Sequence, residues 1–223
     1  MASMDIAETR MPQDGAINMQ VAGRRVDFRV ASYPTEHGEK MVLRILDSSK
    51  DWISIDSLEL PAAQKQRLLD LIEMPQGLVL VAGPTGSGKT TTLYAALLHL
   101  NTIKENILTV EDPIEYRISG ISQGQVNTRK GFTFASALRA MLRLDPNIIL
   151  VGEMRDFETA DIGTQASLTG HLVLSTIHAN SSTQTIVRLS EMGVEKYVIA
   201  SALNGVISQR LLRRVCNACK VTY

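Results

Sequence analysis

The residues that point most clearly to chemistry form one short stretch, residues 83–92. It reads Gly-Pro-Thr-Gly-Ser-Gly-Lys-Thr-Thr-Thr and contains the pattern Gly-x-x-x-x-Gly-Lys-Thr. In this pattern the glycines let the backbone curl so that successive N–H groups surround phosphate oxygens, the lysine reaches the β- and γ-phosphates, and the threonine hydroxyl binds Mg²⁺. The pattern therefore predicts a site for ATP and Mg²⁺. Its residues are Gly83, Pro84, Thr85, Gly86, Ser87, Gly88, Lys89, Thr90 and Thr91, of which Thr90 is the expected metal ligand.

The segments on both sides of this stretch indicate how it is positioned. Residues 78–82 are a short apolar run, and residues 93–98 favour a helix. A strand that leads into the loop and a helix that leaves it are the context in which the pattern marks a phosphate site. An ordinary glycine-rich turn is the alternative, and it would require neither flank. The N-terminus of the helix would add a partial positive charge beneath the phosphates.

Carboxylates follow two other apolar segments of the chain. Glu111 and Asp112 follow residues 107–110, and Glu153 follows residues 148–151. A carboxylate at the end of an apolar strand can bind Mg²⁺ or position the water that attacks the γ-phosphate. Glu153 is therefore a candidate metal ligand, and Glu111 and Glu153 are both candidate general bases. The residue types alone do not decide which glutamate is the base.

Histidine and arginine side chains are the remaining candidates for contact with phosphate. His178 follows an apolar segment and could contact the γ-phosphate, whereas His171 is expected to be structural. Arg29 and Arg44 lie on two N-terminal segments with strand character. Hydrolysis of ATP needs cations near the developing charge, so both arginines are candidate catalytic groups. Further arginines that could form a basic patch are Arg139, Arg143, Arg210, Arg213 and Arg214.

Both cysteines lie near the C-terminus, in the segment Cys216-Asn217-Ala218-Cys219. A Cys-x-x-Cys pair can be half of a zinc site, a redox pair or a coincidence. A structural zinc site has four ligands, so two cysteines cannot complete one by themselves. Two reduced thiols are therefore expected here, in a reducing compartment.

The composition, 44% hydrophobic and 21% charged, is typical of a folded protein, and the order of its segments indicates an α/β fold. The chain has 23 basic and 23 acidic residues, a balance that gives no general attraction to nucleic acid. No run of about 18 apolar residues occurs, so no membrane-spanning helix is expected. Residues 107–110, 148–151 and 172–177 read as strands, with a weaker strand within 114–126. Because helical segments separate these strands, we expect a parallel sheet with helices on both faces.

The pattern also divides the chain into domains. Residues 1–47 read as a partial, mostly-β N-terminal domain, residues 48–52 as a polar linker, and residues 53–223 as the nucleotide-binding domain. Within the last of these, residues 215–223 would begin a cysteine-containing subdomain. The finer expectations are strands at 26–30 and 41–46, a turn at Gly23–Arg24, a loop at 33–38 and a helix over 61–74.

Four blocks of the sequence, in this order, resemble the Walker A, Asp-box, Walker B and His-box motifs of the secretion ATPase superfamily. They are residues 83–94, 108–115, 150–156 and 168–180. More narrowly, the chain resembles the ATPases of type II secretion and type IV pilus assembly over nearly its whole length. The wording of the Asp box and of the His box is specific to this group.

The resemblance implies a fold and a set of residue roles. It implies a RecA-like catalytic domain that assembles as a homo-hexamer, after a PAS-like domain. Arg29 and Arg44 of that earlier domain would approach the nucleotide of a neighbouring subunit. Glu111 would be the general base, and Glu153 would bind magnesium or position water. His178 would contact the phosphate region.

The resemblance also implies a function and a location. The protein would be an ATP-driven motor on the cytoplasmic side of the bacterial inner membrane, bound there through a platform protein, that adds pilin or pseudopilin subunits to a filament. Assembly members carry a four-cysteine Zn²⁺ motif, of which Cys216 and Cys219 would be the start. A retraction or conjugation-type ATPase of the same superfamily is the close alternative.

Two more distant functions are disfavoured by the sequence. A nucleic-acid translocase on the same core would need basic and aromatic surface, but the net charge is +0 and the chain has four Phe and one Trp. A scaffold that binds ATP without turnover would not need the acidic residues Glu111 and Glu153.

Overall fold

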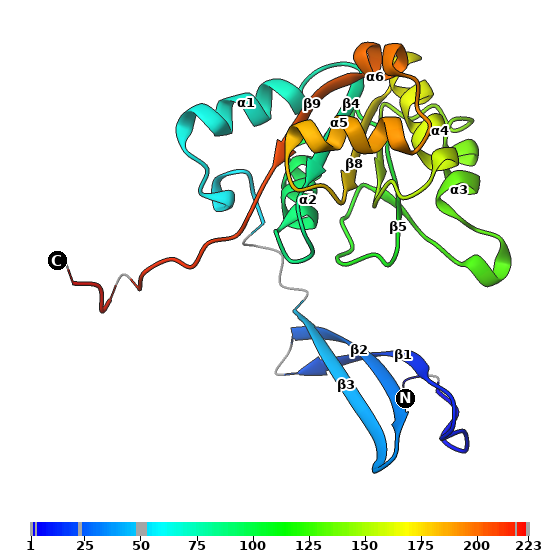
Figure 1. The fold of residues 1–223 in the computed structure, drawn as a ribbon. Coiled ribbons are helices and arrows are strands. Elements are labelled where there is room, and N and C mark those ends of the chain that lie inside the picture. Colours follow the sequence, from blue (N-terminus) through cyan, green and yellow to red (C-terminus); the bar gives the residue numbers. More distant parts are fainter. Residues whose placement is uncertain (1, 3, 22–23, 48–52, 217, 222–223) are drawn as a thin grey trace. The chain divides into compact units, whose positions relative to one another are not determined.

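The structure is a computed structural model that describes residues 2, 4–21, 24–47, 53–216 and 218–221. Contacts divide the chain into two compact units, Met1–Trp52 and Ile53–Tyr223 (Figure 1). The polar linker predicted at residues 48–52 lies outside the described residues. Each unit has its own sheet.

The first unit is a three-stranded antiparallel sheet in the order β1-β2-β3. Its strands are β1 (Gln13–Val21), β2 (Arg24–Thr35) and β3 (Gly38–Asp47). The mostly-β character predicted for this region is confirmed, but the loop predicted at residues 33–38 is too long. Thr35 pairs with Gly38, so the two strands continue to a turn of only two residues. Of the turn predicted at Gly23–Arg24, Gly23 lies outside the described residues.

The second unit contains a six-stranded parallel sheet in the order β6-β5-β7-β8-β4-β9. The parallel sheet predicted from the sequence is therefore confirmed. Its strands are β4 (Gly77–Ala82), β5 (Ile107–Glu111), β6 (Ser122–Gln125), β7 (Ile148–Val151), β8 (Leu172–Ile177) and β9 (Leu203–Ser208). Every residue of β4, β5, β7 and β8 is buried. Burial on both faces explains why these four strands read as continuous apolar runs.

Strand β9, at the edge of the sheet, was not predicted from the sequence. It contains Asn204 and Gly205, two residue types that are depleted in strands. It also follows helix α6 (Lys196–Ala202) without an intervening loop. Pairing with β4 therefore makes this segment a strand, and no local signal does so.

Helices cover both faces of the parallel sheet (Figure 1). The other helices are α1 (Ala62–Ile72), α2 (Lys89–Leu100), α3 (Phe134–Met141), α4 (Phe157–Leu168) and α5 (Ser182–Glu191), with short 3₁₀ turns η1 (Asp56–Leu58) and η2 (Thr128–Lys130). Leu78 and Leu80 of β4 pack in the cluster with α3 to α6, whereas Val79 and Val81 pack with α1 and α2. Within the described residues, no helix combines the length and the apolar character needed to cross a bilayer.

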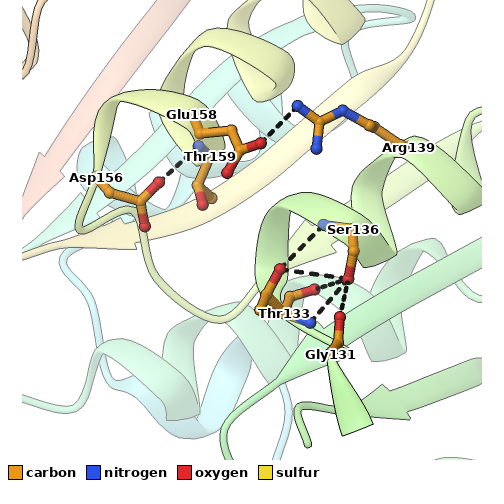
Figure 2. Close-up of polar contacts among 7 residues, drawn as sticks. All are labelled: Gly131, Thr133, Ser136, Arg139, Asp156, Glu158 and Thr159. Carbon is orange, nitrogen blue, oxygen red and sulfur yellow. Dashed lines mark hydrogen bonds and ion pairs between the residues drawn. The ribbon is translucent and has the colours of Figure 1, made fainter. Parts of the chain in front are cut away.

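Two helices on one face begin with side-chain caps (Figure 2). Thr133 and Ser136 form a reciprocal capping box at the start of α3, and the Asp156 carboxylate accepts a 2.8 Å hydrogen bond from the Thr159 amide at the start of α4. Arg139 of α3 donates to Glu158 of α4 at 2.6 Å, which joins the two helices. Caps of this kind satisfy backbone donors that a helix start leaves without partners. The cap of α4 therefore fixes the exact point where the chain leaves the β7–α4 connection.

Candidate nucleotide-binding site

The predicted phosphate loop connects the end of β4 to the start of α2. Gly86 and Gly88 have φ angles of 77° and 87°, in the region that favours glycine. A Cβ atom on Gly83 would lie 2.4 Å from the Ser87 Oγ atom and 2.7 Å from the Gln209 carbonyl oxygen. The glycines of the pattern are thus required by backbone conformation at two positions and by close packing at the third. The loop has the curled form that phosphate binding needs.

Lys89 is the first residue of α2 and is only 9% exposed. Its Nζ atom donates to the carbonyl oxygens of Gly83 and Pro84, at 2.8 and 3.0 Å, so its positive charge lies inside the curl of the loop. Burial lowers the pKa of Lys89, and the Glu153 carboxylate opposes part of that change. An anionic ligand at the loop would favour the charged form of this lysine.

Thr90 lies at the N-terminal end of α2 and is exposed, while Thr91 is half-buried. The hydroxyl of Thr90 is therefore open to a ligand, as its predicted role requires. The amide ends of the first turn of α2 point in the same direction and favour negative charge. These features fit an anion with an associated metal ion.

Glu153 follows β7 and is 8% exposed. Its carboxylate pairs with the Arg155 guanidinium, and His178 Nε2 lies 3.7 Å from its second oxygen. Strands β7, β8 and β4 are parallel neighbours in the sheet. Glu153, His178 and the phosphate loop follow these three strands, so they lie at the same carboxyl end of the sheet. The structure thus brings together Glu153, His178 and the phosphate loop, which were predicted separately. Arg155 was not predicted as part of this site.

Glu111, at the end of β5, is 4% exposed and has neutral partners. Tyr94 donates its phenolic hydrogen to one carboxylate oxygen, and the other oxygen accepts from Thr109 Oγ1 at 2.6 Å and from Gln123 Nε2 at 3.1 Å. Burial, and then the Glu111 charge, raise the pKa of Tyr94, so its hydroxyl remains a donor. Both oxygens of Glu111 are therefore engaged. None of these three partners was predicted from the sequence. Thr109 is a local neighbour on β5, whereas Tyr94 and Gln123 become neighbours through the fold.

Gln209 is a second group at the site that was not predicted. It follows β9, and its side-chain amide donates to the Ser87 carbonyl oxygen at 2.7 Å and accepts from Thr92 Oγ1 at 2.9 Å. Its backbone N–H donates to the Ala82 carbonyl oxygen at 3.0 Å. A residue more than one hundred positions from the loop therefore holds both of its ends.

A pocket of about 570 Å³ opens beside the phosphate loop. One wall is formed by Gly83, Pro84 and Thr85, and another by His178 and the residues after it. Helix α5 supplies the third wall, with residues Gln184, Val187, Arg188 and Glu191. The loop and His178 thus face a common space that a ligand can enter.

The first unit carries the two arginines that were predicted as catalytic groups. Arg29 of β2 and Arg44 of β3 are directly opposite each other in the antiparallel register. Side chains at directly opposite positions lie on the same face of a sheet. The two arginines are therefore neighbours, although they are 15 positions apart in the chain. Their predicted approach to a nucleotide stays a prediction.

Contacts are described for four of the five other arginines that were predicted as a basic patch, and the fifth, Arg213, is exposed. Arg139 pairs with Glu158, and Arg143 lies beyond the end of α3 and donates to the Arg139 carbonyl oxygen at 2.8 Å. Arg210 donates to the Asn180 carbonyl oxygen at 3.0 Å, and Arg214 pairs with Glu59. Arg139 and Arg214 thus join separate segments of the fold, the contact of Arg143 stays at the end of α3, and the partner of Arg210 lines the pocket.

Cys216 and Cys219 are exposed free thiols. Backbone and side-chain hydrogen bonds from Ala218 and Cys219 lower the pKa of Cys216. The described residues, which omit Asn217, contain no group of three or more His, Cys, Asp or Glu side chains that could hold a metal ion. The predicted zinc site therefore has only two potential ligands within this part of the chain.

Known proteins resemble the chain closely in sequence. The Putative type II secretion system protein E of Escherichia coli (strain K12) is 55% identical over 220 residues, which are 99% of this chain and 45% of that protein. The Type II secretion system ATPase E of Vibrio cholerae (strain ATCC 39315 / El Tor Inaba N16961) is 53% identical over 223 residues, which are 100% of this chain and 44% of that protein. The chain thus spans less than half the length of these relatives.

Solved structures and a family model agree with these relatives. The pilus retraction motor PilT with bound ADP has a TM-score of 0.78 and 36% identity over 91% of this chain and 60% of that one. This similarity confirms the predicted RecA-like P-loop fold. The model of the Type II/IV secretion system protein family matches residues 1–223. Since that match covers the whole sequence, the chain belongs to the Type II/IV secretion system protein family.

Proposed function

We propose that this chain is the catalytic part of an ATP-hydrolysing motor that drives assembly of a type II secretion pseudopilus or a type IV pilus. The observation that carries the proposal is the placement of Lys89 and Glu153 at the carboxyl ends of the parallel strands. There the negative charge of Glu153 acts on the buried ammonium group of Lys89. The V. cholerae relative is named an ATPase, which supports turnover as well as binding. Identities of 51% to 56% with type II secretion proteins, against 36% with the retraction motor, favour assembly.

The residues present at the loop fit a magnesium ion and a nucleoside triphosphate. The glycine backbone and Lys89 would hold the phosphates, and Thr90 and Glu153 would hold the metal ion. Bound Mg²⁺ supplies positive charge to the phosphate oxygens during transfer. The exposed hydroxyl of Thr90 and the buried carboxylate of Glu153 are the oxygen ligands that Mg²⁺ prefers.

The contacts of the two glutamates favour different roles for them. Glu153 faces cationic groups and lies beside His178, which lines the pocket at the loop. Both carboxylate oxygens of Glu111 accept internal hydrogen bonds, and Glu111 would have to release one of these bonds before it could accept a proton from water. We therefore assign Glu153 to the positioning of the attacking water and Glu111 to the support of the loop that follows β5. The family pattern would make Glu111 the base, and the two assignments are separable by experiment.

The proposal includes the two arginines of the first unit and an oligomer. Arg29 and Arg44 form a pair of cations on one sheet face, which suits a polyanionic ligand. We propose that they act on the nucleotide of a neighbouring subunit in a hexamer. The protein would work in the cytoplasm, at the inner membrane through a platform protein, and without nucleic acid. Cys216 and Cys219 would supply two thiolates to Zn²⁺, that is, two of the four ligands of a structural zinc site.

The test is steady-state ATP hydrolysis with Mg²⁺ as a function of protein concentration. We expect the specific activity to rise with concentration, because the site would be shared between subunits. Arg29→Ala and Arg44→Ala should each reduce that activity by about 10³-fold or more, the effect of a removed arginine finger. Activity that is independent of concentration and of both arginines would contradict the shared site. Stimulation by single-stranded DNA would instead support a translocase.

A further inference from the structure

We infer that Gln209 is a positioning residue of the phosphate loop, which holds the loop in its nucleotide-binding form from the far end of the chain. This inference rests on the proposed nucleotide site and adds a group to it. Gln209 is not part of the glycine-lysine pattern, and it would not touch the nucleotide. It acts through the backbone that does.

Gln209 makes hydrogen bonds at three points along the phosphate loop and its flanks. Its side-chain amide binds the Ser87 carbonyl oxygen within the loop and the Thr92 hydroxyl in the first turn of α2. Its backbone N–H binds the Ala82 carbonyl oxygen, at the strand end before the loop. The loop is therefore fixed before, within and after its curl by one residue.

The glycines of the loop show how closely Gln209 packs. A Cβ atom on Gly83 would lie 2.7 Å from the Gln209 carbonyl oxygen, and a Cβ atom on Gly88 would lie 3.0 Å from its Nε2 atom. Two glycines of the pattern thus make room for Gln209 as well as for the curl itself. Gln209 therefore packs closely against the first and the last glycine of the pattern, through its backbone at one and its side chain at the other.

The next residue extends the contact to the other side of the pocket. Arg210 donates to the Asn180 carbonyl oxygen at 3.0 Å and to the Gln209 carbonyl oxygen at 3.0 Å. Asn180 lies two positions after His178 and lines the same pocket. The turn after β9 therefore contacts both the phosphate loop and the loop that carries His178.

The opposite end of the same strand offers a matched control. Asn204 donates its side-chain amide to the Gln76 carbonyl oxygen at 2.7 Å, near the start of β4. This bond joins the same pair of strands and is of the same chemical type as the bond from Gln209 to Ser87. It lies at the amino ends of the strands, away from the phosphate loop, so its loss should affect the stability of the fold but not the affinity for ADP.

The experiment measures equilibrium ADP affinity by fluorescence or calorimetry in the 223-residue chain, with the variants Gln209→Met and Asn204→Leu. Each change replaces an amide by an apolar group of similar size. We expect Gln209→Met to weaken ADP binding about tenfold, the equivalent of two ordinary hydrogen bonds. Asn204→Leu should bind ADP as the parent does. Urea unfolding of both variants measures any loss of stability separately.

A double variant tests the path of the effect. Thr92 bonds to the Gln209 side chain, so Thr92→Val should weaken ADP binding in the parent but cause no further loss in Gln209→Met. Equal affinity of Gln209→Met and the parent would overturn the inference and leave the proposed site intact. A parent chain that does not bind ADP would overturn the proposed function instead. Equal losses in Gln209→Met and Asn204→Leu would also overturn the inference, because the effect would then follow general stability.

Discussion

The ends of strands β5 and β7 carry two glutamates that look alike by burial but differ in their partners. Glu111 is 4% exposed and Glu153 is 8% exposed. The partners of Glu111 are two hydroxyl groups and one amide, whereas Glu153 pairs with a guanidinium and lies near an imidazole and an ammonium. Neutral donors hold the Glu111 carboxylate in an internal network, whereas the Glu153 carboxylate lies beside His178, which lines the pocket at the phosphate loop. Burial alone therefore does not identify the acid that acts in the reaction.

The contacts around Glu111 join helix α2 to the segment that follows β5. The Tyr94 hydroxyl accepts hydrogen bonds from the amides of Glu115 and Tyr116, at 3.2 and 3.4 Å, while it donates to Glu111. Tyr94 also packs edge-to-face on Tyr116, with ring centroids 5.6 Å apart. Since Tyr94 belongs to α2, this group of contacts joins the helix after the phosphate loop to the segment after β5. Glu111 lies at the centre of that connection.

Replacement of Glu153 by glutamine should have the largest effect on ATP hydrolysis and separate the roles of the two glutamates. We expect Glu153→Gln to lower the single-turnover rate of ATP hydrolysis by about 10²-fold to 10⁴-fold, because the amide cannot position and deprotonate water as a carboxylate does. ADP affinity should change little. Glu158→Gln, on the exposed start of α4, is the control and should hydrolyse ATP normally. A parental rate in Glu153→Gln would show that the acid at the end of β7 is not required.

Removal of the ammonium group of Lys89 should affect binding rather than only turnover. We expect Lys89→Ala to weaken ADP and ATP binding by about 100-fold or more, since a buried charge that faces phosphate is lost. Calorimetric titration with each nucleotide measures this change. Lys65→Ala removes an ammonium group that pairs with Asp56 near α1 and should leave affinity unaltered. Unchanged affinity in Lys89→Ala would exclude the loop as the phosphate site.

Loss of the Tyr94 hydroxyl should sharpen the difference between the two glutamates. In Tyr94→Phe we expect the free energy of unfolding to fall by about 1–3 kcal/mol, because Glu111 and two backbone amides lose a partner. Urea unfolding measures this loss, and ATP hydrolysis should stay within about tenfold of the parent. Glu111→Gln should behave in the same way. A loss of turnover in Glu111→Gln as large as that in Glu153→Gln would restore Glu111 as the general base.

The smallest expected effect concerns pH. Burial lowers the pKa of Lys89, so the fraction of charged lysine declines as pH rises through that lowered value, and phosphate binding needs the charged form. ADP affinity should therefore weaken as the pH rises through that lowered pKa, with proton uptake on binding over the same range. Calorimetry in two buffers of different ionisation enthalpy measures that uptake. A constant affinity without proton uptake would mean that the loop does not alter this lysine.

Local patterns predicted much of the fold and the centre of the site. The apolar strands β4, β5, β7 and β8 are buried on both faces, which leaves a continuous signal in the sequence. The phosphate loop is equally visible, because glycine is needed where φ is positive and where backbone segments approach closely. Strand β9 has no such signal, because its strand form comes from pairing with β4. Partners that lie far away in the sequence could not be predicted for the same reason.

The sequence by itself determined where the phosphate-loop pattern lies, since the order of glycines, lysine and threonine specifies the loop locally. It also determined that acids follow the apolar strands, since strand ends are local features. Only the tertiary structure decided what surrounds those acids. Glu111 acquires Tyr94 and Gln123, and the loop acquires Gln209, through strand order and helix packing. The physical reason is that a hydrogen bond depends on distance in space, which a local pattern does not contain.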